Sequence, residues 1–319
     1  MKWQKLGKIF DTRDHDLPHG CTEFAQSPQV LVFDDFLRIY FSTRCRDPLN
    51  GKYLSRIAFV DMKKDLRHIN RVSAHTVVEP GELGCYDEHG IFPLNVVRAG
   101  NVVHGYIGGW NRRVSVSVDT SIGLAVSKDN GFTFQRSGRG PVLTSSLHEP
   151  FLVGDPFVVH HANIFHIWYI FGTRWQRFVP DAPPDRVYKI GHAVSADGVE
   201  WRRPQEGQQI IDESLGADES QAMPTVAQFD GRYHMFFCYR QSSDFRHNPT
   251  RGYRIGHAHS DDLTNWIRND AVGGMDVSET GWDSEMLCYP HVFGCDGQHY
   301  LLYNGNEFGR YGFGAAVLE

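Results

Sequence analysis

The sequence predicts an all-β protein made of repeated small antiparallel sheets. Three observations predict it: apolar runs opened by a proline recur along the whole chain, a turn and an aromatic-rich run follow each of them, and helical periodicity is almost absent. A chain of 319 residues would on length alone suggest about two domains of roughly 150 residues each. The repeat instead predicts a single domain over residues 1–319.

Five prolines mark the repeat. They open the runs SPQVLVF, FPLNVV, DPFVVHH, MPTVAQF and YPHVFGC at Pro28, Pro93, Pro156, Pro224 and Pro290. The differences between these positions are 65, 63, 68 and 66 residues. A turn sequence such as FDGR or CDGQ follows each run, and an aromatic-rich run such as YHMFFCY comes next. Two apolar runs joined by an Asp-Gly turn indicate a β-hairpin.

The end of each repeat adds further strands. The segments GLAVSKDNGFTF, GHAVSADGVEW and GHAHSDDLTNW each predict a third strand, a turn and a short fourth strand. Five meanders of four strands describe a five-bladed β-propeller. The last repeat ends at GFGAAVLE after its third strand, whereas KWQKLGKIF precedes the first repeat. We therefore expect the N-terminal strand to complete the fifth blade and close the ring.

Charge and composition exclude several classes of protein. The formal charge is −6, and the Lys and Arg residues are scattered, which argues against a nucleic-acid or membrane partner. No apolar run reaches the roughly 18 residues of a membrane-spanning helix, and the N-terminus does not resemble a signal peptide, so a cytoplasmic location is expected. The six cysteines contain no CxxC pair and are expected to be reduced. The oligomeric state stays open.

Carboxylates recur near the five prolines. A glutamate lies five residues before four of them, and the third repeat instead has an aspartate directly before its proline. Because the inner strands of a propeller begin at one mouth of the axial channel, we expect these groups to cluster there and to raise one another's pKa. The alternative is that each repeated acid caps a turn or pairs with an arginine. The predicted catalytic residues are Asp87, Glu88, Asp155, Glu219 and Glu285.

Polar and aromatic residues near the same mouth form a predicted substrate site. Aromatic rings and planar hydrogen-bonding groups around carboxylates suit the faces and hydroxyls of a small carbohydrate. A salt bridge is the alternative role for each arginine. No HExxH motif, phosphate-binding loop or dinucleotide motif is present, so no cofactor is expected, with a structural cation beside His89 or His291 as an alternative. The predicted substrate-binding residues are Glu23, His89, Trp110, Arg113, Arg174, Trp175, Arg240, His291 and Asn304.

The proline-marked strands, the Asp-Gly turns and the repeated G-H-A-x-S-x-D-G-x-x-W segment resemble the five-bladed propeller glycoside hydrolases. These are the clan of families 43 and 62 and the related families 32, 68, 117 and 130. In family 43 an Asp base, an Asp that tunes the pKa and a Glu acid come from successive inner strands. The resemblance implies that Asp155 is the modulator and Glu219 the acid, with Asp87 or Glu88 as the base. The first repeat has Ser27 where family 43 has its base.

The resemblance implies cleavage of a glycosidic bond by carboxylate acid and base catalysis, with inversion favoured. The substrate would be a small oligosaccharide or glycoconjugate, and Glu23 and Glu285 compete for the catalytic roles. One alternative is a phosphorylase like family 130, in which arginines would hold inorganic phosphate. Another is a non-catalytic, carbohydrate-binding accessory propeller in polysaccharide metabolism. The arginines considered for phosphate are Arg112, Arg113, Arg174 and Arg240.

Overall fold

The computed structural model describes residues 1–319, which form almost entirely antiparallel β-sheet. Tight Asp-Gly turns produce two of the hairpins. Asp230 and Gly231 have φ of 51° and 75°, and Asp296 and Gly297 have φ of 50° and 77°. Positive φ at both central residues gives a turn whose twist matches that of paired strands, which explains why the short polar sequences reverse the chain.

The first two groups of strands share one eight-stranded sheet, in which a single parallel bridge between Ser55 and Gly90 joins them. Each group, called a unit below, starts with a strand that carries a marker proline. Unit 1 consists of β2 (Glu23–Val32), β3 (Leu37–Arg46), β4 (Tyr53–Met62) and β5 (Ile69–Val72). Unit 2 consists of β6 (Gly90–Ala99), β7 (Val102–Arg112), β8 (Val118–Ser127) and β9 (Gln135–Arg136).

The other three units are separate sheets. Unit 3 consists of β10 (Val153–His161), β11 (Ile164–Gln176) and β12 (Asp185–Ser195), extended by a bridge between Val194 and Arg202. Unit 4 consists of β13 (Glu219–Phe229), β14 (Arg232–Gln241), β15 (Arg254–Ser260) and β16 (Ile267–Arg268). Unit 5 consists of β17 (Cys288–Cys295), β18 (Gln298–Asn304), β19 (Phe313–Leu318) and β1 (Trp3–Phe10). The helices are short: η1 (Thr12–Asp14), η2 (Pro18–Gly20), η3 (Pro249–Arg251), α1 (Asp270–Gly273) and α2 (Asn306–Gly309).

The first strands of the units contact one another in a cycle. β2 contacts β6, β6 contacts β10, β10 contacts β13, β13 contacts β17, and β17 contacts β2. Side chains reinforce these contacts: the Val30 N–H donates to His291 Nε2 at 3.0 Å, and the Val292 N–H donates to Thr225 Oγ1 at 3.0 Å. The cycle brings the starts of all five strands together around one cavity.

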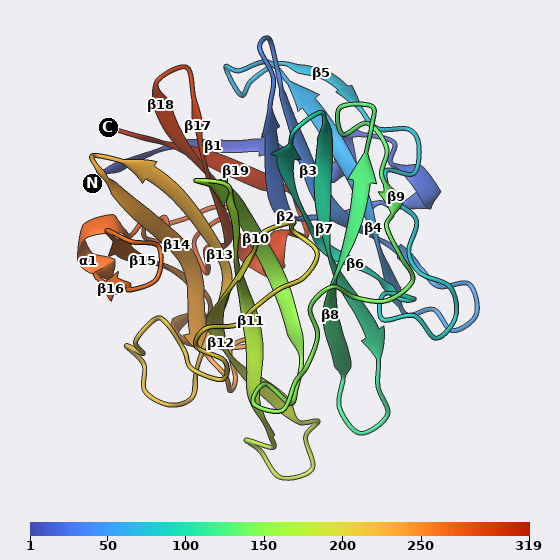
Figure 1. Ribbon diagram of the computed structural model, residues 1–319, viewed down its shortest axis with the longest axis vertical. Helices are drawn as coiled ribbons and strands as arrows, with labels where there is room; N and C mark the ends of the chain where they lie inside the picture. Colours follow the sequence, from blue (N-terminus) through green and yellow to red (C-terminus); the bar gives the residue numbers. More distant parts are fainter.

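The two ends of the chain lie in the same sheet. β1 pairs antiparallel with β19, from Trp3 opposite Leu318 to Phe10 opposite Phe313. Figure 1 shows the N- and C-termini side by side, with the blue β1 beside the red end of the chain. The N-terminal strand therefore forms the outer edge of unit 5, and Phe10 and Phe313 are buried in an apolar cluster shared with unit 1.

A buried ion pair recurs in four of the five units. In each pair an acid that precedes or begins the first strand binds a base from the last segment of the same unit. Since two ions leave water together, they stabilise the fold only as a pair. The tyrosines Tyr169 and Tyr303 also donate to the acids in units 3 and 5. The pairs are Asp87–Arg136, Glu149–Arg203, Glu219–Arg268 and Asp283–Lys5.

All six cysteines are free thiols, as expected from the sequence. The structure contains no helix of sufficient length and apolar character to cross a membrane.

Candidate functional site

A cavity of about 490 Å³ lies at the end of the molecule where the first strands of the units begin. All five units contribute to its lining. Phe24 and Gln26 come from the start of β2, for example, and Tyr289 comes from the start of β17. The cavity is therefore a product of the whole repeat and not of any single sheet.

The residues directly before the marker prolines, called the floor positions below, include three that line the cavity. Each first strand shifts its register with the second strand at this point, so the chain bulges there. Four of these five residues have a positive φ between 50° and 55°, a left-handed conformation that the surrounding fold must hold in place. Phe92, Asp155 and Tyr289 line the cavity. The five residues are Ser27, Phe92, Asp155, Met223 and Tyr289.

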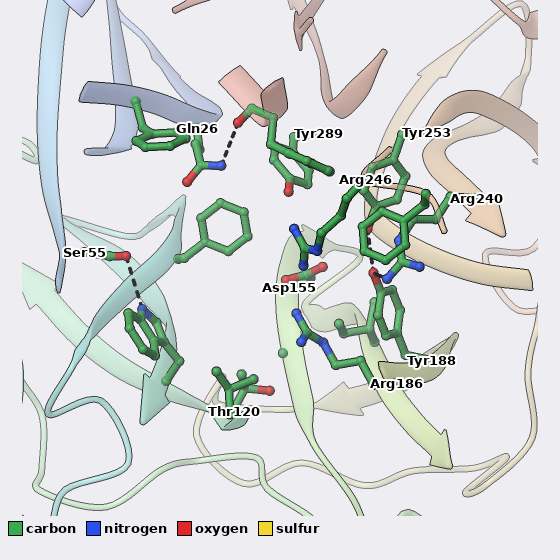
Figure 2. A pocket seen from close by; sticks show the side chains of 18 of the residues that line it. Gln26, Ser55, Thr120, Asp155, Arg186, Tyr188, Arg240, Arg246, Tyr253 and Tyr289 are labelled. Atoms are coloured by element: carbon green, nitrogen blue, oxygen red, sulfur yellow. Dashed lines mark hydrogen bonds between the residues drawn. The ribbon is translucent and has the colours of Figure 1, made fainter. Parts of the chain in front are cut away.

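Asp155 is the only ionisable carboxyl group among these five floor positions. Its side chain is buried, with 9% of the residue exposed, and it makes no ion pair. Burial raises the pKa of Asp155 to about 7, against the opposing effects of the Met223 backbone N–H and the charge of Arg186. Figure 2 shows the carboxyl group between the guanidinium groups of Arg186 and Arg246. A carboxyl group with this pKa exists in both protonation states near neutral pH.

Two more carboxylates line the cavity wall. Glu307 forms an ion pair with Arg310 at 3.1 Å, whereas Glu285 is exposed and makes no ion pair. Glu285 is therefore the second carboxylate that is free to act on a bound ligand.

Aromatic and hydroxyl groups complete the walls. Trp110 Nε1 donates to Ser55 Oγ at 3.2 Å, which fixes the indole at the rim. The hydroxyls of Tyr188 and Tyr253 are 2.5 Å apart, and Arg240 Nη2 donates to the Tyr188 hydroxyl at 2.9 Å. Figure 2 shows these three residues together on one wall. Burial raises the pKa of Tyr253 well above its ordinary value, so its hydroxyl stays protonated and available for hydrogen bonds.

The structure brings four of the predicted site residues together in the cavity: Asp155, Glu285, Trp110 and Arg240. It places Asp87 and Glu219, two of the predicted catalytic residues, outside the cavity lining, where each forms a buried ion pair. Glu219 is completely buried on the face of β13, where Arg268 Nη1 donates to it at 2.6 Å.

Hydrogen bonds from Gln221, the charge of Arg268 and other contacts lower the pKa of Glu219, although its desolvation opposes them. This is the opposite of what a general acid needs. Asp87 is likewise completely buried and is bound by both terminal nitrogens of Arg136. Glu219 begins β13, where a strand side chain points to a sheet face, whereas Asp155 lies in a bulge that lines the cavity.

Four further predicted residues do not line the cavity. Glu88 accepts a bond from the Gly84 N–H at 2.6 Å and contacts His89 at 3.3 Å. His89 stacks on Trp110, and burial lowers its pKa. Arg113 pairs with Asp119 on the surface. Glu23 accepts bonds from the Tyr53 hydroxyl at 2.6 Å and from Arg310 at 2.7 Å, one contact away from the cavity.

The last four predicted residues have structural surroundings. Arg174 pairs with Asp218, and Trp175 packs at the edge of an apolar cluster. His291 accepts the Val30 bond between units 5 and 1, and burial lowers its pKa to about 3. Asn304 is buried, donates to two backbone carbonyls and accepts from the Ser27 N–H. No three His, Cys, Asp or Glu side chains gather into a potential metal site.

Several lining residues were not among those predicted. Arg186 and Tyr188 lie at the start of β12, and Arg246 and Tyr253 lie in the segment that joins β14 to β15. The third strands of units 1 to 3 begin at the cavity. The repeat could therefore have predicted that the first residues of the third strands line the cavity. The segment around Arg246 has no repeated pattern and allows no such prediction.

No family model matches the sequence. Two curated proteins match it over 100% of both chains with 34% identity: "Uncharacterized protein MT1551" from Mycobacterium tuberculosis strain CDC 1551 / Oshkosh and "Uncharacterized protein Rv1502" from M. tuberculosis strain ATCC 25618 / H37Rv. The chain and these relatives thus have the same extent.

Solved structures share the fold at low sequence identity. A "Glycoside hydrolase" has a TM-score of 0.73 and 16% identity, and the match covers 99% of this chain and 92% of that one. The GH43_1 enzyme from Xanthomonas citri complexed with xylose has a TM-score of 0.64 and 15% identity, with 99% and 90% covered. An exo-1,5-alpha-L-arabinanase from a bovine ruminal metagenomic library has a TM-score of 0.63 and 12% identity, with 93% of both chains covered. The resemblance to family 43 and related glycoside hydrolases is thereby confirmed for the fold.

Proposed function

Because the chain belongs to the family of the two full-length mycobacterial proteins and has the fold of glycoside hydrolases, we propose that it is a glycoside hydrolase-like enzyme that acts on a small carbohydrate in the cavity. The observation that carries this proposal is Asp155, a buried carboxyl group on the cavity floor whose pKa of about 7 suits proton donation at neutral pH. Aromatic side chains beside it provide apolar faces for a sugar ring.

In the proposed reaction, protonated Asp155 donates its proton to the oxygen of the leaving group while the glycosidic bond breaks. Glu285, the cavity carboxylate without an ion pair, acts as base and takes a proton from the attacking water. The carboxyl groups end the cycle with opposite protonation and exchange protons with solvent. By resemblance to family 43 we propose inversion at the anomeric carbon, which NMR of the first-formed anomer tests.

The test is a screen with 4-nitrophenyl glycosides, beginning with those of xylose and arabinofuranose because neighbouring structures are named for xylose and arabinan. In Asp155→Asn we expect kcat to fall by about 10²- to 10⁴-fold, the usual contribution of general acid catalysis. The matched control is Asp119→Asn, whose carboxylate lies at the surface outside the cavity. Equal kcat values for Asp155→Asn and the wild type would remove Asp155 from the mechanism.

A second candidate function is carbohydrate binding without turnover. Ser27 occupies the floor position at which family 43 has its base, and Met223 occupies the equivalent position of β13. Asp155 is thus the single carboxylate of the floor. Saturable binding of a sugar, absence of turnover and unchanged affinity in Asp155→Asn would favour this function over catalysis.

We also propose that the five units are the blades of one five-bladed β-propeller that β1 closes. The cyclic contacts of the first strands and the pairing of β1 with β19 support this architecture. Deletion of residues 1–10 should therefore lower the melting temperature of the whole protein in a single transition, because unit 5 loses its edge strand and Lys5. An unchanged melting temperature would contradict closure.

A further inference from the structure

Four arginines line the cavity without a counter-ion: Arg44, Arg186, Arg240 and Arg246. A fifth lining arginine, Arg310, is already bound by Glu23 and Glu307. The sequence as a whole has a formal charge of −6, so these unpaired arginines give the cavity a local charge opposite in sign to the net charge of the protein. Arginine side chains in a partly buried site normally have an acidic partner, because desolvated charge is unfavourable without one.

The aromatic walls hold two of these arginines in place. Arg240 lies 3.5 Å from the ring centroid of Phe245 and donates to the Gln241 carbonyl and the Tyr188 hydroxyl, both at 2.9 Å. Arg44 lies 4.8 Å from the ring centroid of Phe24, and its Nε has no hydrogen-bond partner although it is buried. Stacking on a ring uses the face of the guanidinium and leaves N–H groups at its edge for another acceptor.

The other two unpaired arginines lie on either side of Asp155. Figure 2 shows the guanidinium groups of Arg186 and Arg246 directed toward this carboxyl group. Neither forms an ion pair with it. Arg186 Nη1 donates to Ser117 Oγ at 3.4 Å, and the remaining N–H groups of both side chains are free for a ligand that enters from the open side of the cavity.

We propose that the ligand is an anionic sugar, whose oxyanion, a phosphate or a carboxylate, binds the guanidinium groups of Arg44, Arg186, Arg240 and Arg246. Guanidinium groups match both oxyanions through paired N–H bonds, whereas with a neutral sugar only the unpaired carboxyl groups of Asp155 and Glu285 would offset the four arginines. This ligand is the substrate class of the proposed enzyme, and its identification as a sugar rests on the proposed function. The oxyanion comes either attached to the sugar or as free inorganic phosphate that attacks it.

The experiment measures dissociation constants by titration calorimetry at low salt. The probes are glucuronate and glucose 6-phosphate, neutral glucose, and inorganic phosphate alone and together with glucose. The test variant is the double substitution Arg44→Gln and Arg246→Gln. The control variant is Arg232→Gln, which removes an exposed arginine paired with Asp261 outside the cavity.

We expect at least one oxyanion probe to bind the wild type at least tenfold more tightly than glucose does, with the difference shrinking as salt rises. The double variant should lose at least tenfold in affinity for that probe, whereas Arg232→Gln should bind as the wild type does. Tight binding of glucuronate or glucose 6-phosphate identifies an attached oxyanion. Tight binding of free phosphate that is also required for cleavage identifies phosphorolysis.

The inference is wrong if every oxyanion probe, free or attached, binds the double variant at least as tightly as the wild type. That failure is distinct from failure of the proposed function, because binding is measured without turnover. An oxyanion that binds a protein with no glycosidase activity would refute only the enzyme. Cleavage of neutral glycosides without preference for any anion would refute only the inference.

Discussion

Glu219 and Asp155 are both buried carboxylates of first strands, but their surroundings differ. Glu219 lies on a strand face against Arg268, as Asp87 lies against Arg136, and contributes to the recurring ion pairs between the first and last parts of a unit. Asp155 lies in a bulge at the cavity and forms no ion pair with the nearby arginines. The partnered carboxylates stabilise the sheets, and the unpartnered one remains available for a ligand or a proton.

The largest expected effect concerns the partnered carboxylate. Arg268→Met leaves Glu219 charged and buried without its counter-ion, so the free energy of unfolding should fall by about 3–5 kcal/mol. Urea denaturation measures it. Adding Glu219→Gln to Arg268→Met should recover part of the loss, because the uncompensated charge is then gone. If the single substitution costs less than the double one, the ion pair does not have the role assigned to it.

A smaller effect of opposite sign is expected at Asp155, where substitution should increase the free energy of unfolding at high pH. Between its ordinary pKa of 3.8 and about 7, the folded protein keeps a proton that the unfolded chain has released, so the wild type loses stability as pH rises through this range. Asp155→Asn removes this dependence. At pH 8 the variant should be more stable than the wild type by about 2–4 kcal/mol, and at pH 4 the two should be nearly equal. A constant difference between pH 4 and 8 would show that Asp155 titrates normally.

The same first strands contain a group with the reverse pH dependence. His291 stays neutral in the folded protein down to about pH 3, whereas the unfolded chain takes up a proton near pH 6.5, so stability falls as pH drops below 6.5. His291→Gln keeps an acceptor for the Val30 N–H but cannot be protonated. On going from pH 7 to 5.5 the wild type should lose about 1 kcal/mol more than the variant. Urea denaturation at both pH values measures the losses. Equal losses in the wild type and the variant would contradict the claim that His291 stays neutral in the folded protein.

The smallest effect is expected for an exposed ion pair. Arg113→Met breaks the contact with Asp119 in solvent, where screening makes such pairs worth less than about 1 kcal/mol. Urea denaturation in parallel with Arg268→Met compares a surface pair with a buried one. A loss for Arg113→Met as large as that for Arg268→Met would mean that burial does not explain the difference.

The strand pattern was predictable because its signals are local. Each marker proline lies within a first strand, a few residues after the strand begins, and the Asp-Gly turns at Asp230 and Asp296 reverse the chain where expected. The pairing of the first strand with the last one also follows from local evidence, since GFGAAVLE lacks a fourth strand and KWQKLGKIF offers one.

The site was predictable only in part, because side-chain direction depends on the bulges. Asp155 is adjacent to its proline and therefore at the bulge, whereas Glu219 lies five residues before its proline, at the first residue of β13. The partners of Asp87 and Glu219 are each 49 residues further along the chain, so the ion pairs repeat as the strands do. Their contacts match the alternative in which a repeated acid pairs with an arginine. Arg246 shows no such repeat, and only the folded chain brings it to Asp155.

The pairing of the chain ends has a consequence for the order of the sequence. The Glu319 N–H donates to the Lys2 carbonyl at 3.0 Å, and Lys2 Nζ contacts Glu319 Oε2 at 2.6 Å. A short glycine-rich linker could join the two ends, and new termini could be opened near the exposed Val179 between β11 and β12. Such a circular permutant would keep every strand pair while moving β1 into the middle of the chain. The free energy of unfolding of this permutant would separate two contributions to stability. One comes from strand pairing, and the other depends on the position of the chain termini.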